Sequence, residues 1–282
     1  MAVSQQTAPR PTIVIRPQKI IRIDWRELWA YRELFYYFVW RDFKVKYKQT
    51  AIGAAWAIFQ PFVMMVVFTV FFNRVAGIKS GSSVPYAIFS YTGLMFWNCF
   101  ATAVNNASDS LVVNQAVITK IYFPRAIVPV SATIIAFVDF LFALVVFIGL
   151  AAYYGVVPGL LGVALFIPLA LVTFVAGAGI GLGLSALNLK YRDVRIALPF
   201  FIQTLMFLTP VIYPITLLPH GIRWALYLNP MTGVISTFRA TLLQQSSAGW
   251  PLLGLSTASA LGLLFLGWFV FRTRERAFAD IV

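Results

Sequence analysis

Long stretches without a charged residue constrain this chain more than any other feature of its sequence. No Asp, Glu, Lys or Arg occurs between Phe140 and Leu189, and only 11% of all residues are charged, against about 25% in soluble domains. A transmembrane helix needs about 20 mainly apolar residues, and charge-free runs of that length recur along the chain. The sequence therefore predicts an all-α, polytopic membrane protein and excludes a soluble globular domain.

We predict six transmembrane helices from the positions of these runs. They fall at 50–73, 84–109, 126–154, 160–188, 196–213 and 251–271. The segment 214–245, between the fifth and sixth spans, is apolar and aromatic but is interrupted by prolines, which end continuous helices. We predict that it forms a re-entrant hairpin of two half-helices at the outer surface, with an extracellular cap as the alternative.

The basic residues are distributed unevenly between the two predicted sides of the membrane. Of the 22 Lys and Arg residues, 18 lie in the termini and loops of one side, and the other side holds Arg74, Lys79, Arg223 and Arg239. Because Lys and Arg near the ends of spans are retained in the cytoplasm, both termini are predicted to be cytoplasmic. The net charge of +13 is thus a topology signal, and no nucleic-acid partner is expected.

The residues ahead of the first span are predicted to form an interfacial helix followed by a basic segment, over 24–49. Asp24 is its expected N-cap, and apolar residues recur at helical spacing on one side: Trp25, Leu28, Trp29, Phe35, Tyr36 and Val39. The helix either anchors the chain in the headgroup layer or docks a cytoplasmic partner, and both interpretations stay open. A basic tail, 1–23, precedes it; the six-span domain, 50–272, and a cytoplasmic tail, 273–282, follow.

Four cations lie within eight residues at the end of this segment: Arg41, Lys44, Lys46 and Lys48. Basic residues beside a span are attracted to anionic lipids, so anchoring of the first span explains them in part. A site for the pyrophosphate headgroup of a lipid is the functional interpretation.

Aromatic residues extend from the outer ends of several spans toward the middle of the membrane. A polymer of sugars could slide along aromatic faces without being trapped, although packing against lipid is the alternative for each residue. Tyr86, Phe89, Trp97 and Phe100 fall on one helical stripe. The residues predicted to line a substrate path are Phe68, Phe71, Phe72, Trp97, Phe207, Tyr213, Trp224 and Tyr227.

Two further features of the spans are expected to be structural. Small residues form two ridges on the fourth span, Gly177-Gly181-Ser185 and Gly179-Gly183, which allow close helix packing within or between subunits. Asp139 is the only acidic residue deep within a span. We favour a hydrogen-bonding role for it, with Asn105, Asn106 or Gln203 as partners, because no second acid or His accompanies it for a proton relay.

The sequence offers no set of residues for catalysis. It contains no GxxxxGK[ST] phosphate loop, no paired carboxylates and no Ser/His arrangement, and Cys99 and His220 are each the only residue of their kind. We therefore expect no catalytic residues and no metal site. An integral glycosyltransferase is disfavoured because it would need an acidic metal-binding motif on a large cytoplasmic loop.

Several motifs together resemble the permeases of ABC-2-type polysaccharide exporters, and they cover nearly the whole chain after residue 25. The segment Trp40–Gly53, followed by Trp56 and Gln60-Pro61, carries the resemblance at the first span. Further landmarks follow in the expected order: Lys120–Pro124, Asn188–Asp193, Thr209–Pro214, Asn229-Pro230 and Phe238-Arg239.

The resemblance implies a homodimer in the bacterial inner membrane, paired with two copies of a separate nucleotide-binding ATPase subunit. ATP and Mg²⁺ would bind that subunit, so this chain is expected to hold no cofactor. The residues implied to face the ATPase are Trp29, Arg32, Glu33, Asn114, Gln115 and Lys120. The implied substrate is a lipid-linked polysaccharide, with O-antigen on undecaprenyl pyrophosphate as first choice. Teichoic acid, capsule chains, or a small molecule or drug are the alternatives.

Overall fold

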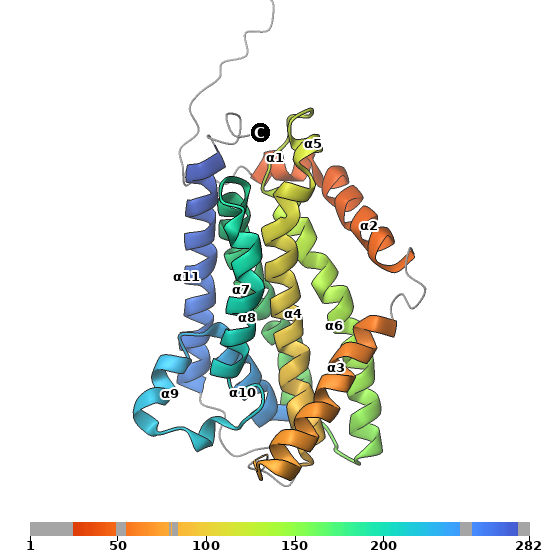
Figure 1. Ribbon diagram of the computed structural model, residues 1–282, viewed down its shortest axis with the longest axis vertical. Coiled ribbons are helices and arrows are strands. Elements are labelled where there is room, and N and C mark those ends of the chain that lie inside the picture. The colour runs from red at the N-terminus through yellow and green to blue at the C-terminus, as the bar shows by residue number, and fades with distance from the viewer. Residues whose placement is uncertain (1–24, 49–54, 79, 81–83, 243–249, 276–282) are drawn as a thin grey trace, which may run out of the picture.

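The computed structural model describes residues 25–48, 55–78, 80, 84–242 and 250–275. The predicted basic tail and Asp24 cap, the junction 49–54, the last part of the predicted hairpin and most of the C-terminal tail lie outside these residues. All regular structure in the described part is helical (Figure 1). The fold is therefore the predicted all-α membrane architecture.

The described chain runs through a series of long helices joined by short helices and turns. In order, these are α1 (Trp25–Ala30), α2 (Arg32–Lys48), α3 (Ala55–Phe68) with the π-helical extension η1 (Thr69–Val75), α4 (Tyr86–Val113), α5 (Gln115–Ile118), α6 (Ile127–Tyr153), α7 (Leu160–Lys190), α8 (Asp193–Leu208), the 3₁₀ turn η2 (Ile215–Leu217), α9 (His220–Leu226), α10 (Pro230–Leu242) and α11 (Trp250–Glu275).

Five of the six predicted spans are long and apolar enough to cross a membrane: α3 with η1, α4, α6, α7 and α11. The remaining one, the predicted fifth span, is α8. It has 16 residues, which corresponds to about 24 Å of helix against a hydrocarbon core of about 30 Å. It ends at Leu208, before the predicted end at 213, because Pro210 and Pro214 follow.

The helices pack into one bundle whose two ends differ in charge (Figure 1). One end, which we call the α1–α5 end, also holds the last residues of α7 and α11, with Lys190, Arg272 and Arg274. The opposite end, called the α9–α10 end, holds Arg223 and Arg239. The described cations thus separate as the sequence predicted, and the cytoplasmic placement of the α1–α5 end stays a prediction.

Helix α4 forms the centre of the bundle, because α6, α7, α3 and α10 all pack against it. Its aromatic side chains account for much of the core. The ring of Phe96 lies 5.0 Å from that of Phe140 in α6 and 4.8 Å from that of Phe238 in α10. Phe166 of α7 completes this group of rings, 5.3 Å from Phe140. A single aromatic cluster therefore joins four helices.

Each of the two small-residue ridges of α7 receives a different helix of the same chain. A methyl group at Gly177 would lie 2.9 Å from the Cβ of Ala103 in α4, so this ridge accommodates α4. On the second ridge, a methyl group at Gly179 would lie 2.6 Å from the Cα of Leu264 in α11. The ridges act within the subunit, which decides between the two alternatives that the sequence left open.

The predicted hairpin segment consists of α9 and α10, and α10 is buried along its described length. Asn229 caps α10 by accepting a hydrogen bond from the Met231 N–H at 3.0 Å, with Pro230 at the first helical position. The amide of Asn229 also donates to Thr209 after α8, at 2.7 Å. These contacts explain the Asn-Pro motif as the start of α10.

Arg239 of α10 is buried, has no carboxylate partner among the described residues, and donates to backbone carbonyls instead. Its guanidinium donates to the carbonyls of Phe89, at 2.8 and 3.1 Å, Pro210, at 2.6 Å, and Val211, at 2.5 Å. It also lies 3.6 Å from the centre of the Phe89 ring. We call these contacts the Arg239 clamp. The clamp joins α4, α10 and the turn after α8.

The α7–α11 contact can be tested through two glycines of α11. A methyl group at Gly267 would overlap the carbonyl of Gly179, whereas one at Gly262 would meet no atom within 4 Å. We expect Gly267→Ala to lower the free energy of unfolding by about 1–3 kcal/mol through overpacking. Gly262→Ala should leave it unchanged or raise it. The measurement is thermal unfolding of the purified chain in detergent, and equal midpoints for the two variants would contradict this packing.

Candidate functional site

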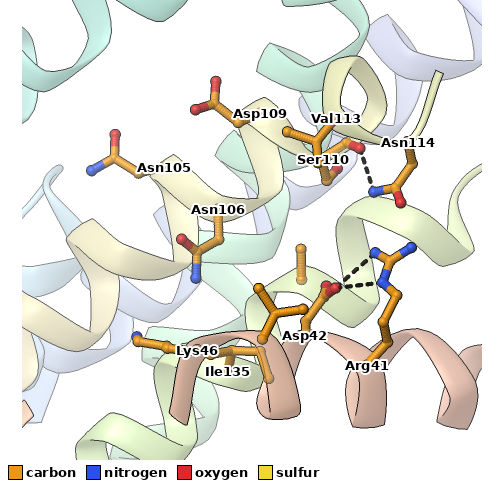
Figure 2. A pocket seen from close by; sticks show the side chains of 12 residues that line it. Arg41, Asp42, Lys46, Asn105, Asn106, Asp109, Ser110, Val113, Asn114 and Ile135 are labelled. Carbon is orange, nitrogen blue, oxygen red and sulfur yellow. Dashed lines mark hydrogen bonds and ion pairs between the residues drawn. The ribbon is translucent and has the colours of Figure 1, made fainter. Parts of the chain in front are cut away.

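A polar pocket of about 290 Å³ lies where α2 crosses α4 and α6, toward the α1–α5 end (Figure 2). Its walls carry charged and amide side chains, in contrast to the apolar faces of the long helices. The lining residues are Arg41, Asp42, Val45 and Lys46 of α2; Asn105, Asn106, Asp109, Ser110 and Val113 of α4; Asn114; and Ala132 and Ile135 of α6.

Two of the four predicted headgroup cations reach this pocket, and both already face a carboxylate. The guanidinium of Arg41 donates twice to Asp42, at 2.7 and 2.9 Å, and lies over the ring of Phe38 (Figure 2). Lys46 forms an ion pair with Asp139 of α6. Each cation is therefore neutralised by a neighbour within the chain.

Asp139 is held by α2 and not by the amides that the sequence suggested. Its carboxylate accepts from the Lys46 ammonium on one oxygen and from the Tyr47 hydroxyl, at 2.6 Å, on the other. Burial raises the pKa of Tyr47 and the hydrogen bond to Asp139 raises it further, so the phenol stays protonated and donates. The expected partners Asn105, Asn106 and Gln203 were wrong, because residues so distant in sequence as Lys46 and Asp139 could not be paired without the fold.

The other two predicted headgroup cations lie outside the pocket. Lys44 and Lys48 are exposed, and the ammonium of Lys44 lies 4.9 Å from the centre of the Trp40 ring. The four cations therefore do not converge on one point. The exposed pair is accessible to an anionic group beside α2, whereas Arg41 and Lys46 shape the pocket.

Asp109 connects the pocket to α7 and α8. Its carboxylate accepts from the Asn188 amide at 3.0 Å and forms an ion pair with Arg195 at 3.5 Å. Asn188 lies in the last turn of α7 and Arg195 in the first turn of α8, which places the Asn188–Asp193 motif next to the pocket. Sequence reasoning missed Asp109; its position one helical turn beyond Asn105 and Asn106 was the available signal.

The predicted aromatic path divides into buried and exposed residues. Trp97 is only 2% exposed, and Phe68 and Tyr227 are also buried, so these three side chains pack within the chain, and their part in a path stays a prediction. The stripe that includes Trp97 is buried because α4 lies at the centre of the bundle, with α3, α6, α7 and α10 packed against it. Phe72 and Tyr213 are half-buried, and the residues that remain exposed are Phe71, Phe207 and Trp224.

The predicted interfacial helix is divided at Tyr31 into α1 and α2, and its packed face differs from the expected one. Leu28, Tyr31, Leu34, Phe35 and Phe38 pack onto a second apolar cluster formed with α4, α6, α7 and α11. Trp29 and Tyr36, which were predicted on the apolar side, are exposed. The sequence could not show which face the ends of the long helices would cover.

Most residues implied to face an ATPase are exposed at the α1–α5 end. Trp29 is 71% exposed, and Arg32, Glu33, Gln115 and Lys120 are exposed too. Asn114 differs from these residues, because its side chain is buried and donates to the Ser110 carbonyl at 2.7 Å; its role in docking stays a prediction. It ends α4 and lines the pocket instead.

Two large residues of the Lys120–Pro124 landmark are exposed at this end, although neither was named individually as a docking residue. Tyr122 is 79% exposed and Ile121 is 57% exposed, in the turn that follows α5. The Tyr31 hydroxyl donates to the Tyr122 carbonyl at 3.4 Å, so this turn lies beside the α1–α2 corner. We call the exposed group Trp29, Arg32, Lys120, Ile121 and Tyr122 the end surface. The signal in the sequence was an apolar pair in a loop otherwise marked by Lys120 and Arg125.

Comparison with known proteins identifies relatives along nearly all of the chain. The sequence pattern of the ABC-2 type transporter family matches residues 33–243. The O-antigen export system permease protein RfbA of Klebsiella pneumoniae is 26% identical over 243 residues, which are 86% of this chain and 92% of that protein. The protein of the same name from Myxococcus xanthus is 26% identical over 261 residues, 91% of this chain and 98% of its own length.

A protein named for a different polysaccharide is also similar. The polysialic acid transport protein KpsM of Escherichia coli is 21% identical over 241 residues, 84% of this chain and 92% of that protein. The pocket, the Arg239 clamp and the end surface all lie within or next to the matched region.

The ion pair between α2 and α6 predicts a specific pattern of stability. Asp139→Asn leaves the Lys46 ammonium without its charged partner, so we expect amide hydrogen exchange in the last two turns of α2 to rise about tenfold. Lys46→Met and Tyr47→Phe combined with Asp139→Leu should restore protection, because all three polar partners are then removed together. Asp193→Asn, at an exposed carboxylate, is the matched control. Unchanged exchange in Asp139→Asn would show that the pair does not hold α2.

Proposed function

The chain belongs to the ABC-2 type transporter family, and on that premise we propose that it is the membrane subunit of a polysaccharide exporter in the bacterial inner membrane. The observation that carries the proposal is the similarity to polysaccharide export and transport proteins over 84–91% of the chain. We infer that the substrate is a lipid-linked chain, with O-antigen on undecaprenyl pyrophosphate as first choice. Both termini would be cytoplasmic.

The energy for transport would come from a separate ATPase subunit, present in two copies beside a homodimer of this chain. ABC-2 permeases are transport subunits and not themselves enzymes, which is consistent with the lack of a phosphate loop in the sequence. ATP and Mg²⁺ would bind the partner, so this chain needs no cofactor of its own. The aromatic and basic character of the end surface supports it as the docking region, since Trp, Tyr and Arg are enriched at protein interfaces.

The exposed lysines of α2 support a role in binding the lipid headgroup. Lys44 and Lys48 lie just before the first span, where cations meet phosphate groups at the membrane surface. Arg41 and Lys46 contribute less to such a site than the sequence suggested, because both are already paired with carboxylates. A pyrophosphate headgroup would therefore lie against the exposed side of α2.

Two alternatives share the fold. Teichoic acid or capsule export differs only in the glycan carried, and the relative named for polysialic acid supports it. Export of a small molecule or drug would require neither a path for sugars nor a lipid-linked chain.

Deletion of the gene tests the proposed function. If this protein exports lipid-linked polysaccharide, the deletion strain should lose long-chain glycan from its surface, because the glycan then accumulates on its lipid carrier inside the cell. Gel electrophoresis of surface glycan is the measurement, and expression of the wild-type chain is the control. Surface glycan of normal length and amount in the deletion strain would contradict the proposal.

The docking region is tested by one exposed tyrosine from each end of the bundle. Tyr122→Ala removes a side chain from the end surface, and we expect the ATPase recovered with the purified permease to fall about tenfold, as for an aromatic interface residue worth more than 1 kcal/mol. Tyr153→Ala changes a similarly exposed residue at the last turn of α6, toward the α9–α10 end, and should leave recovery unchanged. Equal recovery for both variants would place the ATPase elsewhere.

A further inference from the structure

One face of α4 remains partly exposed although the helix is otherwise the most buried span of the bundle. Between residues 98 and 109, every residue on this face is either polar or alanine, and no large apolar side chain interrupts it. The polar members follow one line along the helix at offsets of three and four, and span about 16 Å. We call them the amide stripe: Asn98, Thr102, Asn105, Asn106 and Asp109.

The amide stripe does not have the composition of a surface that faces lipid. Exposed positions elsewhere in the bundle carry large apolar residues, such as Leu141 and Val145 of α6 and Phe265 of α11. Amides placed against hydrocarbon would lose their hydrogen bonds to water without replacement. A span with such a face needs a polar neighbour outside the bundle core.

The side chains of the stripe are largely free to bind that neighbour. Within the described residues, no hydrogen bond involves the side chains of Asn98, Thr102, Asn105 or Asn106. Asp109 uses its carboxylate for Asn188 and Arg195, but a carboxylate can accept about four hydrogen bonds. The stripe thus offers both unpaired donors and unpaired acceptors.

The stripe opens into the pocket between α2, α4 and α6, which provides room for a ligand (Figure 2). In this close-up, Asn106 points from α4 toward α2, while Asn105 and Asp109 project from the same helix. The formal charges of the lining residues sum to zero, because Arg41 and Lys46 are positive and Asp42 and Asp109 are negative. A balanced lining favours a neutral polar ligand over a phosphate group.

We propose that the amide stripe is a sugar-binding subsite that takes neutral, polyhydroxylated rings of the exported glycan. This inference rests on the proposed function. A sugar hydroxyl both donates and accepts, and an Asn amide offers a matching donor and acceptor on one planar group. The pocket would receive the sugar nearest the headgroup bound by α2. The stripe would then guide following rings along α4, with exchangeable hydrogen bonds that water can replace.

The test compares two lipids on the full-length chain, purified with its ATPase subunit in lipid nanodiscs. The probes are undecaprenyl pyrophosphate alone and the same lipid carrying a neutral disaccharide. We expect the wild type to bind the glycosylated lipid about tenfold more tightly, a difference of one or two neutral hydrogen bonds. The triple variant Asn98→Leu, Asn105→Leu, Asn106→Leu should reduce this preference to less than about twofold, with binding of the sugar-free lipid unchanged.

Leucine is similar in size to asparagine and favourable in a membrane helix, so the triple variant keeps α4 intact. Gln203→Leu, an exposed amide of α8, is the matched control and should retain the preference. Asn105→Gln keeps an amide and should retain it as well. Light scattering of each sample reports whether the subunit assembly is unchanged.

Four results would overturn the proposal. The triple variant could keep the tenfold preference, or the wild type could bind both lipids equally, which would leave the proposed export function standing. The triple variant could instead dissociate the assembly, which would assign the stripe to a contact between copies of this chain. Failure of the wild type to bind either lipid would overturn the proposed function together with this inference.

Discussion

Backbone polar groups at membrane depth have no water to bind, and this constraint governs how the chain ends its helices. The turn after α8 contains Pro210 and Pro214, so its carbonyls cannot be satisfied by continued helix. Arg239 donates two hydrogen bonds there, to the carbonyls of Pro210 and Val211, and three more to Phe89 and Thr92 of α4. Tyr86 donates to the Ile212 carbonyl at 2.5 Å. A buried cation is thereby stabilised by carbonyl and hydroxyl dipoles and by the face of the Phe89 ring. The prolines, the arginine and the start of α4 form one unit.

The two ends of the bundle consequently differ in how they are held. At the α9–α10 end, one buried cluster of hydrogen bonds joins α4, α10 and the turn after α8. Toward the α1–α5 end, partly exposed ion pairs, Lys46–Asp139 and Arg195–Asp109, join α2 to α6 and α8 to α4. Ion pairs that solvent can reach are screened by salt, and their side chains rearrange more readily than a fully buried cluster of hydrogen bonds. We infer that the end proposed to meet the ATPase is the more adaptable one, as a part that responds to nucleotide must be.

Hydropathy and charge predicted the architecture because the length of each apolar run and the positions of Lys and Arg beside it can be read from consecutive residues. The end of α8 at Leu208, the cap at Asn229 and the glycine ridges of α7 also depend on local sequence signals, and of these the ridges were predicted. The site was less predictable, because it depends on which face of a helix its neighbours cover. Trp97 and Asn105 both lie on α4, and only the packing of α6, α7 and α10 shows that the aromatic face is buried and the amide face is open. The ion pair between Lys46 and Asp139 could not be predicted from the sequence either, because the two residues are far apart along the chain.

Transport in a reconstituted system tests the central claim most directly. The chain and its ATPase subunit would be inserted into sealed vesicles with the ATPase outside and lipid-linked polysaccharide in the outer leaflet. The measurement is the fraction of glycan protected from an added glycosidase after ATP is supplied. We predict that protection rises with ATP and not with a non-hydrolysable analogue. Glycan that stays fully accessible, although the complex is assembled and hydrolyses ATP, would contradict the account.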